Sequence, residues 1–498
     1  MSLEHFDVLI VGAGLSGIGA AYHLQYKCPR RTYAILEGRD AIGGTWDLFR
    51  YPGIRSDSDM YTLGYKFKPW TNPKAIADGP SILAYVNETA REYGIDRRIR
   101  FGHWVKSASW SSETARWTVE AERGDRREVV RFTCNFLFMC SGYYDYEQGY
   151  TPEFAGREDF RGRVVHPQKW TEDIDFAGKR VVVIGSGATA VTLVPAMAET
   201  AAHVTMLQRS PTYMGSAPDE DRMANALRRW LPERVAYAIT RWRNIVGSLL
   251  LFQFCKRWPE RAKRFFLRMV EKELGAGFDV AKHFTPSYYP WDQRLCLVPN
   301  ADLFKAMREG RASVVTDQIE RFTANGIRLK SGEELPADLI VTATGLNLKF
   351  LGGMQVHVDG ERIDPAEGMT YRGMMLRGVP NLAWAFGYTN ASWTLRADLN
   401  CEYVCKLLNH MAEHGHEIAR PELNDPEVQP ENWMNLTSGY VQRSIHLFPK
   451  QGSKLPWKLY QNYALDLAMI GWGRIDDGAM QFGSREPKQT RERERAAA

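Results

Sequence analysis

The chain has 498 residues, too many for one compact core, and its 44% apolar and 25% charged residues are ordinary values for a folded protein. Its net charge is only +5, with both signs mixed along most of the chain, which argues against a dedicated nucleic-acid binder. The seven cysteines show no CxxC pair and no metal-ligand spacing, so we expect buried thiols and no metal site. The first strand is expected near Phe6, leaving no room for a signal peptide, and no apolar run approaches the roughly 20 residues of a membrane span. We therefore expect a cytoplasmic protein of two or three domains.

Residues 6–37 predict a strand, a glycine-rich turn, a helix and a second strand. The turn is Gly12-x-Gly14-x-x-Gly17, and bare backbone N–H groups at the following helix N-terminus bind a pyrophosphate. Glu37 ends the second strand, about 20 residues after Gly17, where a carboxylate accepts hydrogen bonds from ribose hydroxyls. By analogy with other proteins that contain two such units, the first unit binds FAD.

The next segments connect this unit to a second one. Residues 40–60 predict a long functional loop, 79–94 a helix, and the stretch around Gly124-Asp125 a β-hairpin. A buried strand is expected at 135–142, followed by a turn-rich domain boundary near residue 148. The stretch at 160–170 is then expected to link the two nucleotide-binding units.

Residues 179–209 repeat the strand–turn–helix–strand pattern with Gly185-x-Gly187-x-x-Ala190. Here the second strand is followed by Arg209 and Ser210 rather than by an acid. A carboxylate would repel a 2′-phosphate, whereas an arginine forms charge-assisted hydrogen bonds with it. The second unit therefore predicts NADPH rather than NADH, with Arg209 and the turn residues as its ligands.

Residues 217–280 predict an inserted helical subdomain in which, between 222 and 272, basic side chains far outnumber acidic ones. One interpretation is a packed helical layer with a solvated basic face, and the other is peripheral contact with anionic lipid. Buried strands are expected at 337–345 and 381–388, and an amphipathic helix follows the second of these. The polar tail from residue 484 predicts disorder.

Two motifs indicate a family. Phe160, Gly162, His166 and Trp170 match FxGxxxHxxxW, the fingerprint of Baeyer–Villiger monooxygenases. Residues 43–57, GGTWDLFRYPGIRSD, match a second family motif, from Gly44, Thr45 and Trp46 to Asp57. The chain thus resembles, over nearly its whole length, the class B flavoprotein monooxygenases. The stretches YPWDQRLCLVP and FGYTNASWTLRADL are similar to the subgroup that contains the bacterial monooxygenase activating thioamide prodrugs.

The resemblance implies a reaction and its residues. Reduced FAD, formed with NADPH, reacts with O₂ to give a flavin C4a-peroxide that converts ketones to esters or lactones, with sulfoxidation as a side activity. Arg294 takes the position of the family's catalytic arginine, a cation that does not deprotonate, and Asp57 is expected to hold its guanidinium as a buried pair. Family members often carry a lysine before this arginine, whereas this chain has Gln293.

Two aromatic or titratable residues keep alternative interpretations. His166 is a candidate base because its ordinary pKa is near 6.5, but in a linker and before a proline it is better interpreted as fixing linker geometry. Trp393 borders the nicotinamide or substrate, or it packs in the core. The identity of the ketone, the regiochemistry and the oligomeric state are left open.

The predicted fold class is α/β, with two doubly wound, Rossmann-like dinucleotide-binding domains and a helical insertion. The partners are a small ketone or sulfide and O₂. A flavin-containing N- or S-monooxygenase is the closest alternative function. A flavin disulfide reductase is a second alternative, but it needs a redox-active cysteine pair, and none of the seven cysteines shows that spacing. A non-enzymatic, membrane-bound flavoprotein is a third alternative, and it would rest on the basic helical stretch alone. The predicted domains are FAD-binding 1–148 and 346–483, NADPH-binding 149–213 and 290–345, a helical insertion 214–289 and a disordered tail 484–498.

Overall fold

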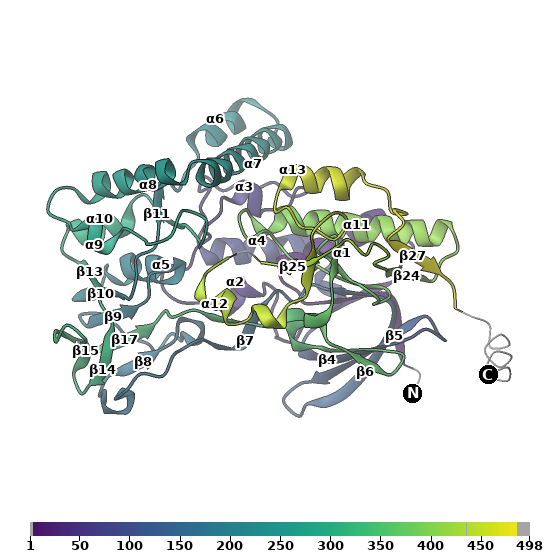
Figure 1. Cartoon of the computed structure of the whole chain (residues 1–498), viewed down its shortest axis with the longest axis horizontal. Helices are drawn as coiled ribbons and strands as arrows, with labels where there is room; N and C mark the ends of the chain where they lie inside the picture. The colour runs from purple at the N-terminus through teal and green to yellow at the C-terminus, as the bar shows by residue number, and fades with distance from the viewer. Residues whose placement is uncertain (1–2, 435, 486–498) are drawn as a thin grey trace.

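A computed structural model describes residues 3–434 and 436–485, in which two β-sheets lie side by side with helices packed around each (Figure 1). The larger sheet has eleven strands in the order β20-β19-β4-β5-β6-β1-β2-β3, with β23 also on β6 and β21-β22 attached to it. Its strands are β1 Glu4–Val11, β2 Tyr33–Leu36, β3 Ile99–Arg100, β4 His103–Ser111, β5 Arg116–Arg123, β6 Glu128–Met139, β19 Gln355–Val358, β20 Glu361–Ile363, β21 Thr370–Tyr371, β22 Met375–Leu376 and β23 Leu382–Trp384.

The nucleotide-binding part of this sheet is parallel. Strand β1 runs parallel to β2 and to β6, and the last four residues of β1 are buried, as expected for a strand covered on both faces. Helix α1 (Leu15–Lys27) packs beside α11 (Trp393–Glu413), where His23 Nε2 lies 3.4 Å from an Asp398 carboxylate oxygen and a side chain on Gly19 would come within 4.0 Å of the same oxygen. The hairpin predicted around Gly124 is confirmed by the antiparallel pairing of β5 with β6.

The smaller sheet is entirely parallel, in the order β13-β10-β9-β17-β8. Its strands are β8 Arg163–Val165, β9 Arg180–Ile184, β10 His203–Gln208, β13 Ala312–Thr316 and β17 Leu339–Thr342, and its helices include α5 Ala188–Met197 and α10 Asp302–Arg308. Strand β8 lies inside the stretch 160–170 that we expected to be a linker. Part of that stretch is therefore the edge strand of the second sheet, because Arg163–Val165 pairs in register with β17.

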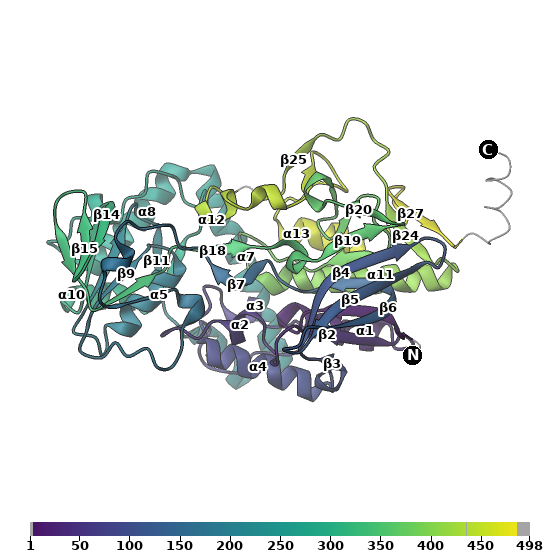
Figure 2. The same cartoon turned by 90° about the horizontal axis from the view of Figure 1, so that it is seen from below.

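The two domains are joined by a ribbon. Strands β7 (Tyr144–Gly149) and β18 (Leu346–Leu348) pair antiparallel, with Leu346 opposite Gly149. The segment expected to be an irregular boundary is thus a strand, and both connections between the sheets run side by side (Figure 2). The predicted boundaries at 148 and 345 fall within or beside this ribbon.

The inserted helices bridge the two domains. They are α6 Arg222–Trp230, α7 Glu233–Arg257, α8 Pro259–Leu274 and α9 Val280–His283, and they lie between the paired strands β11 Met214–Ala217 and β12 Cys296–Pro299. Helix α7 contacts α3 (Met60–Leu63) of the FAD side, where the buried Arg241 donates to the carbonyls of Tyr61 and Gly64 at 2.7 and 2.8 Å. Helix α8 contacts β11 and α10 of the other domain.

The remaining elements complete the surface. They are α2 Thr45–Leu48, α4 Gly79–Glu92, α12 Gly439–Gln442, α13 Tyr463–Asp466, a π-helix at Leu467–Trp472, β14 Ile319–Thr323, β15 Gly326–Leu329, β16 Glu334–Pro336, β24 Ile418–Pro421, β25 Pro430–Asn432, β26 Lys450–Gly452 and β27 Met480–Gly483. All seven cysteines are buried and unpaired. Among the described helices, none combines the length and apolar character of a transmembrane span. The described residues also contain no group of three or more potential metal ligands. The tail predicted to be disordered lies almost wholly outside the described residues.

Candidate active site

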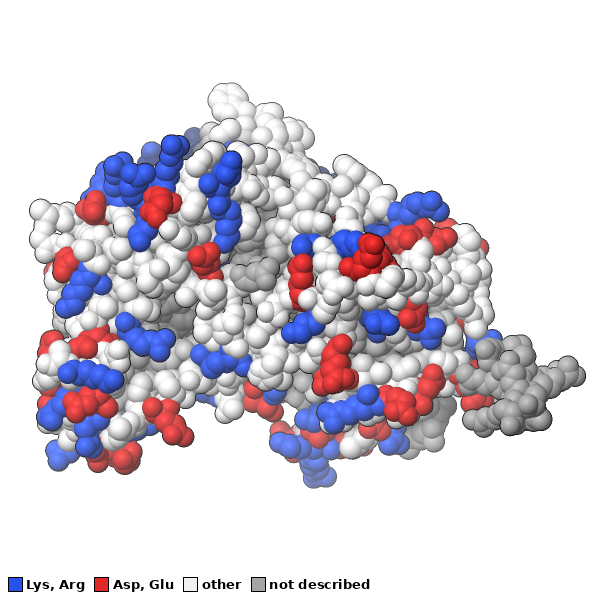
Figure 3. Space-filling model, in the orientation of Figure 1, with Lys and Arg blue, Asp and Glu red and all other residues white. Residues whose placement is uncertain are grey.

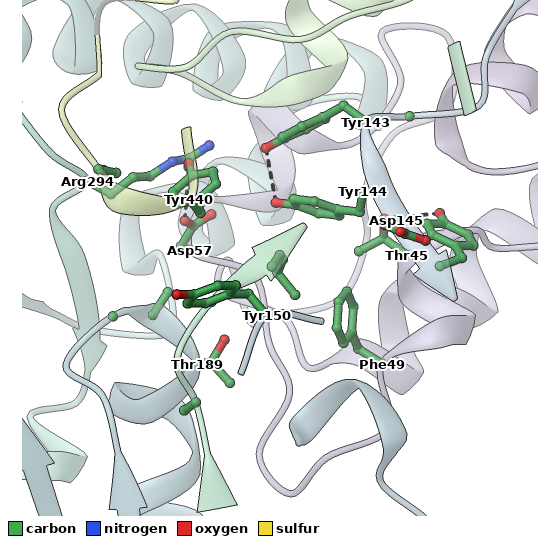
Figure 4. A pocket seen from close by; sticks show the side chains of 18 of the residues that line it. Thr45, Phe49, Asp57, Tyr143, Tyr144, Asp145, Tyr150, Thr189, Arg294 and Tyr440 are labelled. Atoms are coloured by element: carbon green, nitrogen blue, oxygen red, sulfur yellow. Dashed lines mark hydrogen bonds and ion pairs between the residues drawn. The ribbon is translucent and has the colours of Figure 1, made fainter. Parts of the chain in front are cut away.

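One cavity of about 960 Å³ lies where the two glycine-rich turns face each other, and it contains most of the predicted site (Figure 4). Its lining from the prediction comprises Gly12, Gly14, Glu37, Gly44, Thr45, Trp46, Asp57, Gly185, Gly187, Thr189, Arg209, Ser210, Arg294 and Trp393. Gly17, Ala190 and the four motif residues of 160–170 are absent from this lining. Residues predicted from two separate nucleotide units and from two distant motifs are thus brought to a single space.

In the first glycine turn, Gly12 and Gly17 allow close packing of the backbone, whereas Gly14 lines the cavity. A side chain on Gly12, whose φ is +104°, would come within 2.6 Å of the Cys140 carbonyl oxygen, and one on Gly17 within 1.8 Å of the Gly12 oxygen. Gly14 caps the N-terminus of α1 and lines the cavity. Because the first N–H groups of a helix lack intrahelical acceptors, this end of α1 suits the pyrophosphate of a dinucleotide.

Glu37 lies at the C-terminal end of β2, as predicted, and is buried. Its carboxylate accepts hydrogen bonds from the backbone N–H of Ala13 at 2.7 Å and of Arg39 at 2.9 Å. Burial raises the pKa of Glu37, while these two N–H donors and the Arg39 charge oppose the rise. The two N–H donors hold the carboxylate against the glycine turn, where an adenosine ribose would lie in a bound dinucleotide.

The second turn repeats this division. A side chain on Gly185, with φ +139°, would lie 2.3 Å from the Ala343 carbonyl oxygen, and Ala190 is fully buried. A side chain on Gly187 would meet no atom within 4 Å, so the backbone there faces open cavity. Arg209 and Ser210 are exposed just after β10 and line the same cavity. These residues fit a second dinucleotide, and Arg209 lies beside the cavity after β10, where the sequence predicted it.

The segment 43–57, which we predicted to belong to a long loop but which contains the short helix α2, runs from the first nucleotide site to the second domain. It begins at Gly44, where a side chain would lie 3.1 Å from the Gly14 Cα. Farther along, Gly53 (φ +74°) lies against α5, since a side chain there would approach Ala196 Cβ at 2.7 Å. Arg55 forms a bidentate ion pair with Asp302 of α10. The second family motif therefore forms an interface between the domains.

This loop ends at Asp57, whose carboxylate lies 3.3 Å from an Nη of Arg294. The pair faces the cavity, with 33% of the arginine side chain and 39% of the aspartate exposed. The expectation of a buried pair is therefore wrong in degree, because both groups line an open space. Burial alone would lower the pKa of Arg294, but Asp57 raises it well above its ordinary value, so the guanidinium stays charged.

An aromatic wall faces the Arg294–Asp57 pair (Figure 4). Trp393 donates its indole N–H to Ser16 Oγ at 2.8 Å and stacks on Tyr143 with ring centroids 5.3 Å apart. The hydroxyls of Tyr143 and Tyr144 are 3.0 Å apart, and burial raises the pKa of Tyr144 to about 12. Trp393 thus both borders the cavity and packs, so the two interpretations are compatible.

The fingerprint residues lie outside the cavity lining, and among them His166 contacts the junction between the domains. His166 Nε2 is 3.0 Å from the Gly345 carbonyl oxygen, and its Nδ1 accepts the Gln168 N–H at 3.1 Å. These contacts assign the proton of a neutral imidazole to Nε2, and burial lowers the pKa of His166, which favours that neutral form. Phe160 and Trp170 contact Phe322 and Phe176, and Gly162 fits closely against Asp338.

Several cavity residues were not found by sequence reasoning. Tyr143 and Tyr144 follow a buried strand, a position that is itself a signal for a site in a parallel sheet. Tyr440 and Arg443 come from α12 and the residue after it, far along the chain, and no local motif marks them. The Arg443 guanidinium stacks 3.5 Å from the Tyr150 ring centroid, and two of its nitrogens are buried without a hydrogen-bond partner in the described structure.

The fold and the cavity together define a flavoprotein oxidoreductase with two dinucleotide sites that open into one reaction space. A sequence model described as flavin-binding monooxygenase-like matches residues 71–241, and one described as an NAD(P)-binding Rossmann-like domain matches 10–70. The chain is 57% identical to the FAD-containing monooxygenase EthA of Mycobacterium tuberculosis over 97% of this chain and 98% of that protein. It is 52% identical to the putative FAD-containing monooxygenase MymA of the same organism, again over 97% and 98%.

The chain therefore belongs to the FAD-containing monooxygenase family of EthA, and its predicted resemblance to class B flavoprotein monooxygenases is confirmed. Its fold is also similar to that of a solved steroid monooxygenase bound to NADP, with a TM-score of 0.74 and 22% identity over 96% of this chain and 100% of that one. The predicted cofactors, FAD and a nicotinamide dinucleotide, agree with this membership.

Proposed function

We propose that the chain is an NADPH-dependent monooxygenase that inserts one oxygen atom of O₂ next to the carbonyl of a ketone, giving an ester or lactone, and that it also oxidises soft sulfur compounds. The observation that supports this most is the Arg294–Asp57 pair on the wall of the shared cavity. When bound, reduced FAD supplies the activated oxygen. The protein's part is to position the ketone and to stabilise the charge that develops on it.

Arg294 has the geometry for that part. Its guanidinium has several N–H donors, and among described side chains only Asp57 accepts a hydrogen bond from it, at 3.3 Å. The remaining donors are available to a carbonyl oxygen in the cavity, and a fixed cation stabilises the negative charge that forms there. Asp57 orients the guanidinium because it is fixed at the end of the loop that Arg55 and Gly53 hold against the second domain.

NADPH is the expected reductant because Arg209 stands at the end of β10 without a carboxylate partner in the described residues. Gly187 and Thr189 bring the N-terminus of α5 to the same cavity, where backbone N–H groups suit the pyrophosphate. His166 is expected to hold the domain junction through Gly345 and to take no part in oxygen transfer.

The proposal is tested by mass spectrometry of products formed with NADPH and ¹⁸O₂ from linear, cyclic and aryl ketones, a thioether and a tertiary amine. Wild-type enzyme is expected to place one ¹⁸O atom in an ester or lactone. Arg294→Ala is expected to keep oxidising NADPH while ester formation falls about 10²–10³-fold, the usual effect of removing one charge-stabilising donor. Arg294→Lys keeps the charge but not the planar guanidinium, so its rate of ester formation should lie between those of the wild-type enzyme and Arg294→Ala.

Two results would contradict the proposal. If only the amine or the thioether were oxygenated, the chain would be an N- or S-monooxygenase that needs no charge stabilisation on a carbonyl. If Arg294→Ala formed esters at the wild-type rate, Arg294 would have no part in the reaction.

A further inference from the structure

Half of the exposed large apolar side chains in the described structure lie between Met223 and Phe265, on α6, α7 and α8. Along α7 they form one stripe, recurring every three or four residues, whose members are 42–65% exposed. The stripe consists of Val235, Ile239, Trp242, Val246 and Leu250. Residues at this spacing share one face of a helix, and Tyr237, Arg241 and Ile245 form the opposite, buried face. One side of helix α7 is therefore buried against the protein, and the opposite, exposed side is apolar as well.

More exposed apolar groups lie close to this stripe. Trp230 ends α6 with 86% of its surface exposed, and Trp258, between α7 and α8, is 48% exposed. From the C-terminal part of the chain, Leu465 and Trp472 are 51% and 78% exposed, on helices that meet α7 through a contact between Trp242 and Tyr463. In Figure 1, α6, α7, α8 and α13 lie along the same upper edge of the molecule. Contiguous exposed apolar surface of this kind marks an interaction site.

Helix α8 adds a stripe of positive charge to the same edge. Its exposed basic residues also recur every three or four positions, from the end of α7 to the end of α8, and are Arg257, Arg261, Arg264, Arg268 and Lys272. None of these five forms an ion pair with another residue in the described ranges. Figure 3 shows the resulting blue cluster over α8, next to the white projecting surface over α6 and α7. Exposed apolar side chains and tryptophans beside a row of basic residues form the composition of a surface that binds anionic lipid.

We propose that this α6–α8 face binds the surface of an anionic lipid membrane. The apolar stripe of α7 and the tryptophans enter the headgroup region, where indole rings are favoured, and the basic stripe of α8 meets lipid phosphates. A second copy of the chain is a poorer occupant, because a two-fold contact through this face would bring two basic stripes together. This inference rests on the surface alone and is independent of the proposed reaction.

The test is sedimentation of the purified, flavin-loaded full chain with phosphatidylcholine vesicles that contain or lack phosphatidylglycerol. Binding is expected only to the anionic vesicles at low salt and is expected to weaken at high salt, because screening shortens the reach of the basic stripe. Each basic residue near such a surface strengthens binding about fivefold. Reversing three of them should weaken it by more than about 100-fold.

Matched variants distinguish the effect of changing this face from the effect of changing the net charge. The test set is Arg261→Glu, Arg264→Glu and Arg268→Glu, and the control set, with the same change in charge on exposed residues elsewhere, is Arg126→Glu, Lys330→Glu and Arg362→Glu. The control set should weaken binding less than about fivefold, because those residues belong to the β5–β6 turn, the β15–β16 turn and β20, none of which is part of the α6–α8 face. A third set, Ile239→Ser, Val246→Ser and Leu250→Ser, should weaken it more than about tenfold at unchanged charge. Flavin absorbance and melting temperature establish that each variant is folded.

Three outcomes would overturn the proposal. In the first, the wild-type chain fails to sediment with anionic vesicles at low salt. In the second, the control set loses as much binding as the α8 set. In the third, analytical ultracentrifugation shows a self-associated species that the serine set dissociates while vesicle binding is absent, so that the face is an interface between copies.

Discussion

Arg209 offers a direct test of how the second dinucleotide is selected. It is exposed immediately after β10, lines the cavity, and forms no ion pair with a described residue. Arg209→Ala therefore removes a potential ligand without leaving a buried charge unpaired. The adjacent Ser210 stays in place because the Ser186 hydroxyl donates to its carbonyl oxygen at 3.0 Å.

The size of the effect follows from the chemistry of the contact. A hydrogen bond to a charged group contributes about 1.5–3 kcal/mol, and an exposed site takes the lower part of that range. A loss of about 1.5–2 kcal/mol raises the Kd for NADPH roughly 10- to 30-fold. NADH lacks the 2′-phosphate, so its Kd should change less than about twofold. The difference should shrink as salt is added, because the Debye length falls below about 8 Å.

Anaerobic stopped-flow reduction of the flavin gives both constants from the dependence of rate on NADPH and on NADH. Arg126→Ala, an exposed arginine in the β5–β6 turn, is the control for loss of one positive charge and should leave both constants unchanged. Equal increases for NADPH and NADH in Arg209→Ala would refute the reasoning, because the arginine would then serve a part that both dinucleotides share.

Three further changes test the junction and the cavity wall. Gly53→Ala should cost more stability than Gly94→Ala by about 1–2 kcal/mol in urea unfolding, because both have positive φ but only Gly53 has neighbours in the way. Equal losses would remove steric fit as the cause. His166→Gln should flatten the gain in stability from pH 5.5 to 7.5: burial lowers the folded pKa, so the unfolded chain binds the proton more readily and stability is lost as pH falls below about 6.5. An unchanged slope would contradict this. Trp393→Phe loses the donation to Ser16, about 1 kcal/mol, and should lower product formed per NADPH while flavin reduction keeps its rate.

The local parts of the site could be predicted because their chemistry is encoded locally. The turns at Gly12 and Gly185 require positive φ and close backbone approach, so the residue type itself carries the information. Arg209 was found in the same way, from its place after a predicted strand. Asp57 and Arg294 could be named only through the family resemblance, since nothing in their own segments shows that they meet across the domain boundary.

The parts that could not be predicted depend on tertiary assembly. Tyr440 and Arg443 reach the cavity from near the C-terminus, and the pairing of β7 with β18 needs two segments almost 200 residues apart in sequence. The exposure of Asp57 was also misjudged. A motif gives the identity of an ion pair but not its solvent access, which depends here on the cavity that the two residues line.

The contacts of the fingerprint stretch 160–170 likewise depend on how the two domains assemble. Its Arg163–Val165 is the edge strand of the second sheet, and His166, directly after it, bonds to Gly345 in the other connection between the domains. A side chain on Gly149 would collide with the His166 ring, at 2.0 Å from Cε1, so the histidine fills the space against both connections at once. We therefore expect a change in the angle between the domains to disturb the contacts of this imidazole. Since the segment 43–57 also contacts both domains and ends at Asp57, we propose that the two family motifs together set how the two domains are placed relative to each other.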